Sequence, residues 1–207
     1  MDIIKSNKKF DTQKILELAC AAQRINGKYI KETDWLFSPP DQNKLYPNKI
    51  LILHTLNLVN FHTMPPKHLK VISEDVTLAD EIRKYYRRLS FTVMDDNSDN
   101  KHFPNEVNQI FNAPEITTSE VGYLACLPSL YPRDVVRDRI KKYVSKCAND
   151  YLGAVGEEIY DKDCEILDVT RSKNFDAWNI TAVIENMMVS WMSSKELTVG
   201  PCVIVTV

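Results

Sequence analysis

Short apolar segments with strand-like spacing fill the last third of this chain and constrain its fold more than any other feature. From residue 164 onward the segments read CEILDVT, NITAVIE, MMVSWMS and CVIVTV. In the second segment Ile180, Ala182 and Ile184 occupy every other position, which is the spacing of one face of a β-strand. The segments therefore predict four consecutive strands.

The connections between these segments favour an antiparallel arrangement. A short turn at Glu185-Asn186 joins the second segment to the third, which predicts a tight hairpin. The stretch 193–201, SSKELTVGP, fits a one-turn helix or a closing loop. The last segment, 202–207, is apolar enough to be buried on both faces if a barrel were complete.

Helical spacing dominates the residues before 150. In 11–25 apolar residues recur every three or four positions, with Asp11 as the expected N-cap and Gly27 as the stop. The segment 73–89 begins at Ser73 and predicts the clearest helix, which FTVM extends as helix or as a short strand. Further helices are expected over 48–60 (with a strand as the alternative), over 106–112, from Thr118 or Ser119 to Leu127, and from Pro132 to near Asn149.

These patterns predict the α+β class, with a mostly α-helical N-terminal domain over 1–150 and a partial antiparallel β-barrel over 164–207. The segment between them, 151–163, reads YLGAVGEEIYDKD and contains two Gly and four acidic residues. That composition is typical of a linker between domains.

The composition excludes several classes of protein. Apolar residues make up 44% and charged residues 26% of the chain, the balance of a soluble globular protein. No apolar run reaches the roughly 20 residues that span a membrane, and the N-terminus lacks a secretory signal. We therefore expect a cytoplasmic protein without a membrane partner.

Cysteine and histidine spacings do not indicate a metal site. Five Cys and four His are present, without a CxxC or HExxH pattern. Reduced, mostly buried thiols are the simplest interpretation. We expect neither a metal nor another cofactor.

Charge is distributed unevenly along the chain. Residues 150–207 contain 4 basic and 10 acidic residues, whereas residues 1–149 contain 22 basic and 18 acidic ones. The predicted β domain is therefore the acidic part. This argues against strong phosphate binding by the β domain alone, because such affinity comes mainly from Lys and Arg.

The order YLGAVGEEI, a β segment, SKNFDAWNITAVI and VSWMSSKELTVG resembles a module of bacteriophage and mobile-element proteins. In that group a GxxGE lead-in precedes an oligonucleotide-binding (OB)-like barrel. The resemblance covers 151–207, and the helical stretches ADEIRKYYRRL and VGYLACLPSLYPRD also resemble what precedes the module. The chain departs from the pattern by ending inside the fourth strand, before the fifth strand and its basic loop.

The resemblance implies a single-stranded-DNA-binding accessory protein of phage replication or recombination, in the host cytoplasm. The loop between the first two strands carries Arg171, Lys173, Phe175 and Trp178, and Trp191 lies in the third strand. Bases stack on aromatic rings while cations follow the phosphates. The alternative is that the two tryptophans are barrel core.

A second candidate for DNA binding lies on the helix after Pro132. Arg133, Arg137 and Lys141 recur at i, i+4 and i+8, on one helix face. Asp134 and Asp138 interleave with them, which equally fits a solvated face of ion pairs. A further basic set lies in 73–89: Arg83, Lys84, Arg87 and Arg88.

Catalytic motifs are absent from the sequence. It contains no GxSxG elbow, Gly-Lys phosphate loop or Gly-rich dinucleotide turn. We predict a protein that is not an enzyme. The alternative function is a structural or interaction component of a phage, which docks a protein partner or a second copy of itself through an open β-edge at the C-terminal strand.

Overall fold

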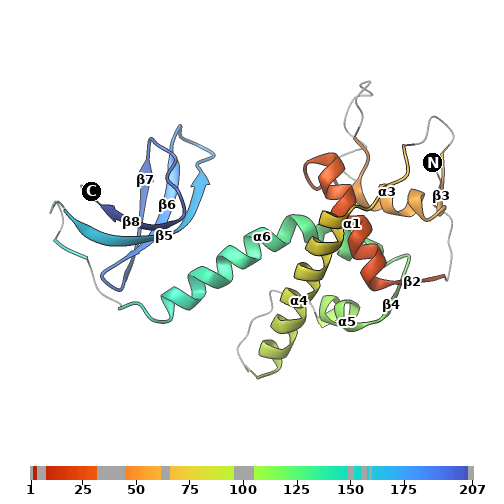
Figure 1. Ribbon diagram of the computed structural model, residues 1–207, viewed down its shortest axis with the longest axis horizontal. Helices are drawn as coiled ribbons and strands as arrows, with labels where there is room; N and C mark the ends of the chain where they lie inside the picture. The colour runs from red at the N-terminus through yellow and green to blue at the C-terminus, as the bar shows by residue number, and fades with distance from the viewer. Residues whose placement is uncertain are drawn as a thin grey trace. The chain divides into compact units, whose positions relative to one another are not determined.

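The computed structural model of the chain describes residues 2–3, 8–31, 45–61, 66–95, 105–148, 152–154, 158 and 160–204. The chain divides into two compact units, Met1–Tyr131 and Pro132–Val207 (Figure 1). Helices lie mainly in the first unit and a four-stranded antiparallel sheet lies in the second. The fold class is α+β, as predicted.

Helix α1 (Thr12–Asn26) follows the signals expected from the sequence. The Asp11 carboxylate accepts a hydrogen bond of 2.8 Å from the Lys14 backbone N–H, which satisfies a donor of the first turn. Gly27 ends the helix at φ 67°, a left-handed conformation that glycine adopts at little cost.

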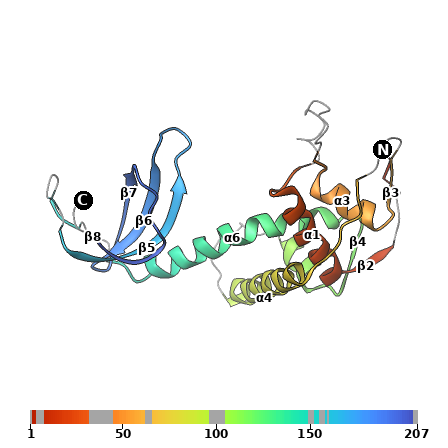
Figure 2. The same ribbon diagram turned by 45° about the horizontal axis from the view of Figure 1, so that its top comes forward.

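The described residues also form the helices α3 (Asn48–Thr55), α4 (Ser73–Asp95), α5 (Asn105–Asn112) and α6 (Val121–Val144). Helix α1 packs against both α3 and α4 (Figure 2). The rings of Tyr86 and Phe111 stack at 5.0 Å between α4 and α5. The core thus forms where the apolar faces of separate helices meet, and its fully buried members include Ile15, Leu16, Ile52, Leu53, Ile82 and Leu124.

Two pairs of very short strands connect distant segments of the first unit. Strand β1 (Asp2–Ile3) pairs with β3 (Val59–Asn60), and β2 (Lys9–Asp11) pairs with β4 (Glu115–Thr117). The Thr12 hydroxyl donates a 2.8 Å hydrogen bond to the carbonyl of Ala113 beside the second pair. Two or three residues carry no readable alternation, so the sequence did not predict these strands.

The prediction of two successive helices, one ending at Leu127 and the next beginning at Pro132, was wrong, because a single helix, α6, covers both segments. It runs without a break from Val121 to Val144, through Pro128 and Pro132. A proline removes one helical hydrogen bond and crowds the preceding turn, which can bend a helix without ending it. The apolar first half of α6 is anchored by buried Val121 and Leu124.

The second unit contains β5 (Lys162–Arg171), β6 (Trp178–Ile184), β7 (Met187–Ser193) and β8 (Gly200–Ile204). They form an antiparallel sheet in the order β7-β6-β5-β8. Three consecutive strands followed by a fourth beside the first make a Greek key. The four predicted strands are confirmed, but the sheet that they form is open, so the described strands do not close a barrel.

The hairpin between β6 and β7 is the tight turn expected from the sequence. Glu185 and Asn186 have φ values of 47° and 65°, and positive φ at both central residues defines a type I′ turn. The connection 194–199 is a loop rather than the helical turn that was the other expectation. Residues 205–207 of the predicted last strand lie outside the described residues.

The sheet has one face that builds a small core and one that does not. Cys164, Ile166, Ile180, Ala182 and Ile184 are buried together on the first face. We call this the inner face, and the opposite one, which carries Glu165, the outer face. A register shift between Ile166 and Asp168 marks a bulge in β5, beyond which the strand bends more strongly.

The C-terminal half of α6 is tied to the sheet within the second unit. Glu165 on the outer face accepts hydrogen bonds from Arg139 at 3.0 Å and from the Tyr143 hydroxyl at 2.6 Å. The Ala148 N–H donates to the carbonyl of Asn186 at 2.8 Å. The domains 1–150 and 164–207 expected from the sequence thus differ from the compact units, since residues 132–163 group with the sheet.

Candidate nucleic-acid interface

The end of β5 and the start of β6 bring a cation and an aromatic ring together. Arg171 lies directly opposite Trp178 in the strand register, and its guanidinium carbon is 5.3 Å from the ring centroid. This is a cation–π contact. The same guanidinium forms an ion pair with the carboxylate of Asp176.

The loop between these strands is held by its own backbone and by Ser172. The Ser172 N–H donates to the carbonyl of Ala177 at 2.9 Å, which closes the loop. The Ser172 hydroxyl lies 3.4 Å and 3.3 Å from the backbone nitrogens of Asn174 and Phe175. In this loop conformation Phe175 lies at the surface, where its side chain is 63% exposed.

Trp178 and Trp191 share the inner face of the sheet. Ile180 faces Trp191 across β6 and β7, and Trp178 lies two residues from Ile180, so the two rings are diagonal neighbours. Both are half-buried and pack against the inner-face core. They therefore have a structural role, and each keeps part of its surface exposed.

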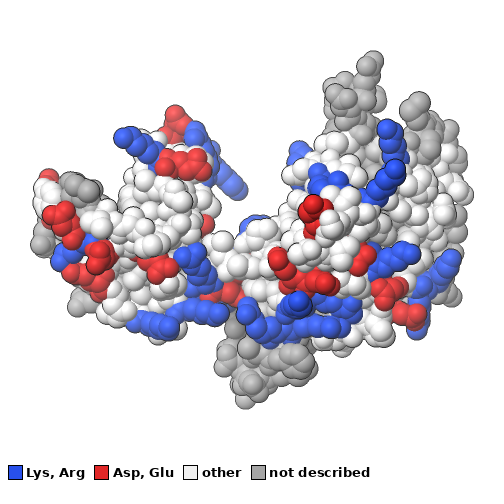
Figure 3. All heavy atoms as spheres, in the orientation of Figure 1, with Lys and Arg blue, Asp and Glu red and all other residues white. Residues whose placement is uncertain are grey.

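Exposed basic side chains follow the C-terminal half of α6. Arg133, Arg137 and Lys141 are all exposed, and Arg137 pairs with Asp134 at 3.0 Å. Figure 3 shows Lys and Arg gathered along this part of the helix. Arg139 points elsewhere and binds Glu165 of the sheet.

The two candidate groups are thus separate. Arg171 and Trp178 face each other at the β5–β6 end of the sheet, whereas α6 is attached through Glu165 on the outer face. The register places Arg171, Trp178 and Trp191 on the inner face, with Phe175 and Lys173 in the adjoining loop.

The joining of α6 to the sheet changes the charge balance of the β-rich unit. Residues 132–148 contain six basic and two acidic residues, so the unit 132–207 has ten basic and twelve acidic residues. The sheet alone is strongly acidic, and the helix supplies most of the cations. A domain boundary at residue 150 assigns the basic helix and the acidic sheet to different domains, so the near-neutral charge of 132–207 is not apparent from it.

The third basic set, on α4, is partly structural. The Arg83 guanidinium donates to the Gln13 side chain at 3.0 Å. Burial, together with the charge of Arg87, lowers the pKa of Arg83. Arg88 lies over the Tyr85 ring at 5.5 Å. Arg83 and Arg88 therefore make contacts within the helical unit, whereas Lys84 and Arg87 are exposed.

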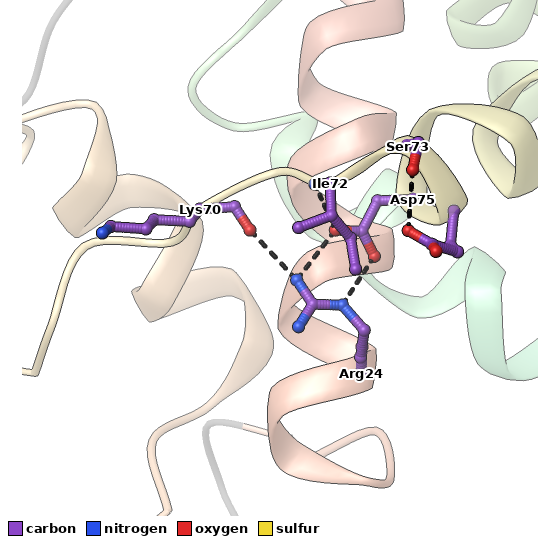
Figure 4. Close-up of polar contacts among 6 residues, drawn as sticks. Arg24, Lys70, Ile72, Ser73 and Asp75 are labelled. Atoms are coloured by element: carbon purple, nitrogen blue, oxygen red, sulfur yellow. Dashed lines mark hydrogen bonds and ion pairs between the residues drawn. The ribbon is translucent and has the colours of Figure 1, made fainter.

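Sequence inspection missed a cavity of about 550 Å³ in the helical unit. Its rim includes Arg24, which forms an ion pair with Asp75 and also donates to the carbonyl of Lys70 (Figure 4). Its lining comes from several distant segments, which is why no local pattern indicated it: Leu45, Leu51, Leu69, Lys67, His68 and Lys70.

Among the described residues, no group of three or more His, Cys, Asp or Glu is placed to hold a metal ion. No helix within the described ranges is long and apolar enough to cross a membrane. Comparisons with protein-family models, curated proteins and solved structures find no match.

Proposed function

We propose that this protein binds single-stranded DNA through the β5–β6 end of its sheet. The observation that carries the proposal is the exposed Phe175 in the loop that follows Arg171, whose guanidinium lies over the Trp178 ring. Exposed aromatic rings next to cations are the elements from which single-strand platforms are built. The Greek-key order of the strands supports the OB-like analogy, at the level of fold alone.

The proposed roles follow from exposure. Phe175 stacks on a base, a contact worth about 1–3 kcal/mol in such proteins. Lys173, exposed in the same loop, contacts a phosphate. Trp178 and Trp191 form the floor of the platform, since they are held by the core.

The α6 cations have a different proposed role. Arg133 and Lys141 are exposed on a segment with excess positive charge. They attract DNA over a distance and are screened by salt. They add affinity without discrimination between single strands and duplexes.

The test is fluorescence anisotropy with labelled oligo-dT at low and moderate salt. We expect binding at low salt, weakened about tenfold by Phe175→Ala and less by Lys173→Gln. The matched control is Lys195→Gln, an exposed lysine in the β7–β8 loop, which should leave affinity nearly unchanged. Absence of binding at low salt, where the electrostatic contribution is largest, would contradict the proposal.

A second candidate function is self-association through the edge of β7. Strand β7 lies at the edge of the sheet, and among the described residues no strand pairs with the edge of β7 that points away from β6. Its sequence, MMVSWMS, has no charged residue and no proline, the features with which proteins protect edges. The opposite edge, β8, contains Pro201.

The pattern of β7 suits pairing with a second copy of this chain. An antiparallel two-fold pairing centred on Ser190 sets Met188 opposite Met192 and Val189 opposite Trp191 of the other copy, without like charges facing each other. Met192 is 51% exposed on the outer face. Such pairing would cover this apolar surface.

Light scattering coupled to size-exclusion chromatography tests this second candidate. We expect a concentration-dependent dimer that Ser190→Lys abolishes, because two lysines would meet at the axis. Thr181→Lys is the control, since Thr181 faces Ser190 on the interior strand β6. A wild-type monomer at all concentrations would contradict self-association and leave DNA binding unaffected.

A further inference from the structure

Cys164 and Cys202 lie directly opposite each other on neighbouring antiparallel strands. The register of β5 and β8 pairs them, between the pairs Asp163–Val203 and Glu165–Pro201. Directly opposed residues of antiparallel strands point to the same face, with their Cα atoms about 4.5–5.5 Å apart. Disulfides need a Cα separation of about 4.4–6.8 Å.

Both cysteines also lie in the core of the inner face. Cys164 is 4% exposed and Cys202 is half-buried, and both pack with the inner-face core. All five cysteines are free thiols in this structure.

We infer that Cys164 and Cys202 form a reversible disulfide that locks strand β8 onto strand β5. The oxidant is a low-molecular-weight disulfide such as oxidised glutathione. Neither cysteine belongs to the proposed DNA platform, so this oxidation site is independent of DNA binding.

The chemistry begins at Cys202, the more accessible sulfur. Burial, followed by the effect of the neighbouring Cys202, raises the pKa of Cys164 to about 12, so Cys164 is a poor first nucleophile. The Cys202 thiolate attacks the oxidant, forms a mixed disulfide and releases one small thiol.

The second step closes the bridge. Cys164 faces Cys202 across the two strands, so its sulfur attacks the Cys202 sulfur of the mixed disulfide, and the second small thiol leaves with the proton that Cys164 loses. In total two protein thiols lose two electrons and two protons, and the small disulfide is reduced to two thiols. The balance requires no other reactant.

The bridge would affect the edge of the sheet. It closes the segment 165–201 into a loop that contains β6 and β7. A cross-link of this kind restricts the unfolded chain and raises the melting temperature, here by an amount on the order of 10 °C. Strand β8 would then be unable to detach from β5.

The experiment treats the folded full chain with oxidised glutathione and then alkylates the remaining thiols in urea, so that buried Cys20 also reacts. Intact mass is expected to fall from five alkylated thiols to three, without retained glutathione. Peptide mapping should find Cys164 joined to Cys202, and dithiothreitol should reverse both changes.

Variants separate this pair from other cysteines. Cys147→Ser should still form the bridge and gain about 10 °C in melting temperature on oxidation. Cys164→Ser should instead retain glutathione on Cys202 without the thermal gain. The inference is overturned if the bridge joins other cysteines, if glutathione stays attached to the wild type, or if the bridge forms only in urea.

Discussion

Arg24 on α1 binds both carboxylate oxygens of Asp75 on α4, from Nε at 3.0 Å and from Nη2 at 2.9 Å (Figure 4). Asp75 also accepts a 3.0 Å hydrogen bond from the Ile72 N–H at the start of α4. Its side chain is 4% exposed, while that of Arg24 is 41% exposed. One carboxylate therefore joins two helices and caps one of them.

Removal of this carboxylate should destabilise the helical unit. We expect Asp75→Ala to lower the free energy of unfolding by about 2 kcal/mol, because a cap and the partner of a cation are lost together. Urea denaturation followed by circular dichroism measures the change. Glu74→Ala, an exposed acid in the same turn, is the control and should have a much smaller effect.

The Asp75 contribution should depend on pH. Burial acts to raise the pKa of Asp75, but hydrogen bonds from Arg24 and Ile72 outweigh it and hold the pKa below its usual value. Its stabilising effect is therefore complete above about pH 4 and is lost as the pH falls through the lowered pKa. The stability difference between wild type and Asp75→Ala should shrink in acid, and a constant difference down to pH 2 would contradict this.

His54 should destabilise the protein in mild acid. Burial, and then the charge of His68, lowers the pKa of His54, and the two rings lie 4.5 Å apart. As the pH falls, His54 of the unfolded chain takes up a proton near pH 6.5, whereas His54 of the folded chain does so only at a lower pH. The free energy of unfolding therefore decreases as the pH drops below about 6.5. Melting temperatures of His54→Gln between pH 7 and 5 should fall less than those of wild type, whereas equal slopes would exclude His54 as the cause.

Asn186 offers a matched pair of substitutions in the β6–β7 turn. Its φ of 65° favours glycine and is costly for β-branched residues. We expect Asn186→Gly to keep or raise stability by up to about 1 kcal/mol, and Asn186→Val to lower it by about 1–2 kcal/mol. Thermal unfolding that ranks the two variants in the opposite order would contradict the turn assignment.

Asp176 should limit the affinity for DNA if the proposed platform is correct. Its carboxylate pairs with Arg171 and would repel a phosphate there. Asp176→Asn should increase oligo-dT affinity several-fold and steepen its salt dependence by roughly one counterion. Glu196→Gln is the charge-matched control, because it also neutralises one exposed carboxylate, in the β7–β8 loop. Equal gains in affinity in both variants would show a non-local effect.

Local patterns predicted most of the secondary structure. Asp11 and Gly27 were identified as the ends of α1 because capping and left-handed φ depend on neighbouring residues alone. Glu185-Asn186 marked the hairpin for the same reason. The break expected at Pro132 was wrong, since a proline weakens a helix locally while packing along the helix decides whether it continues.

The sequence showed the types of the candidate DNA-binding residues but not how they are placed. The sequence placed Arg171 and Trp178 in one loop, and only the strand register brought them face to face. The sequence assigns the basic residues of 133–146 to the N-terminal helical domain, whereas in the structure Glu165 ties that helix to the sheet.

The sequence by itself determined most of the helices and the four strands of the β-rich unit, because capping, turn chemistry and apolar spacing act within a few residues. Only the tertiary structure decided which distant groups meet: Arg24 with Asp75, and Cys164 with Cys202. Those pairs lie 51 and 38 positions apart in the chain. Their contacts depend on how helices pack and in which order strands pair, and these choices are set by burial of the whole core rather than by local spacing.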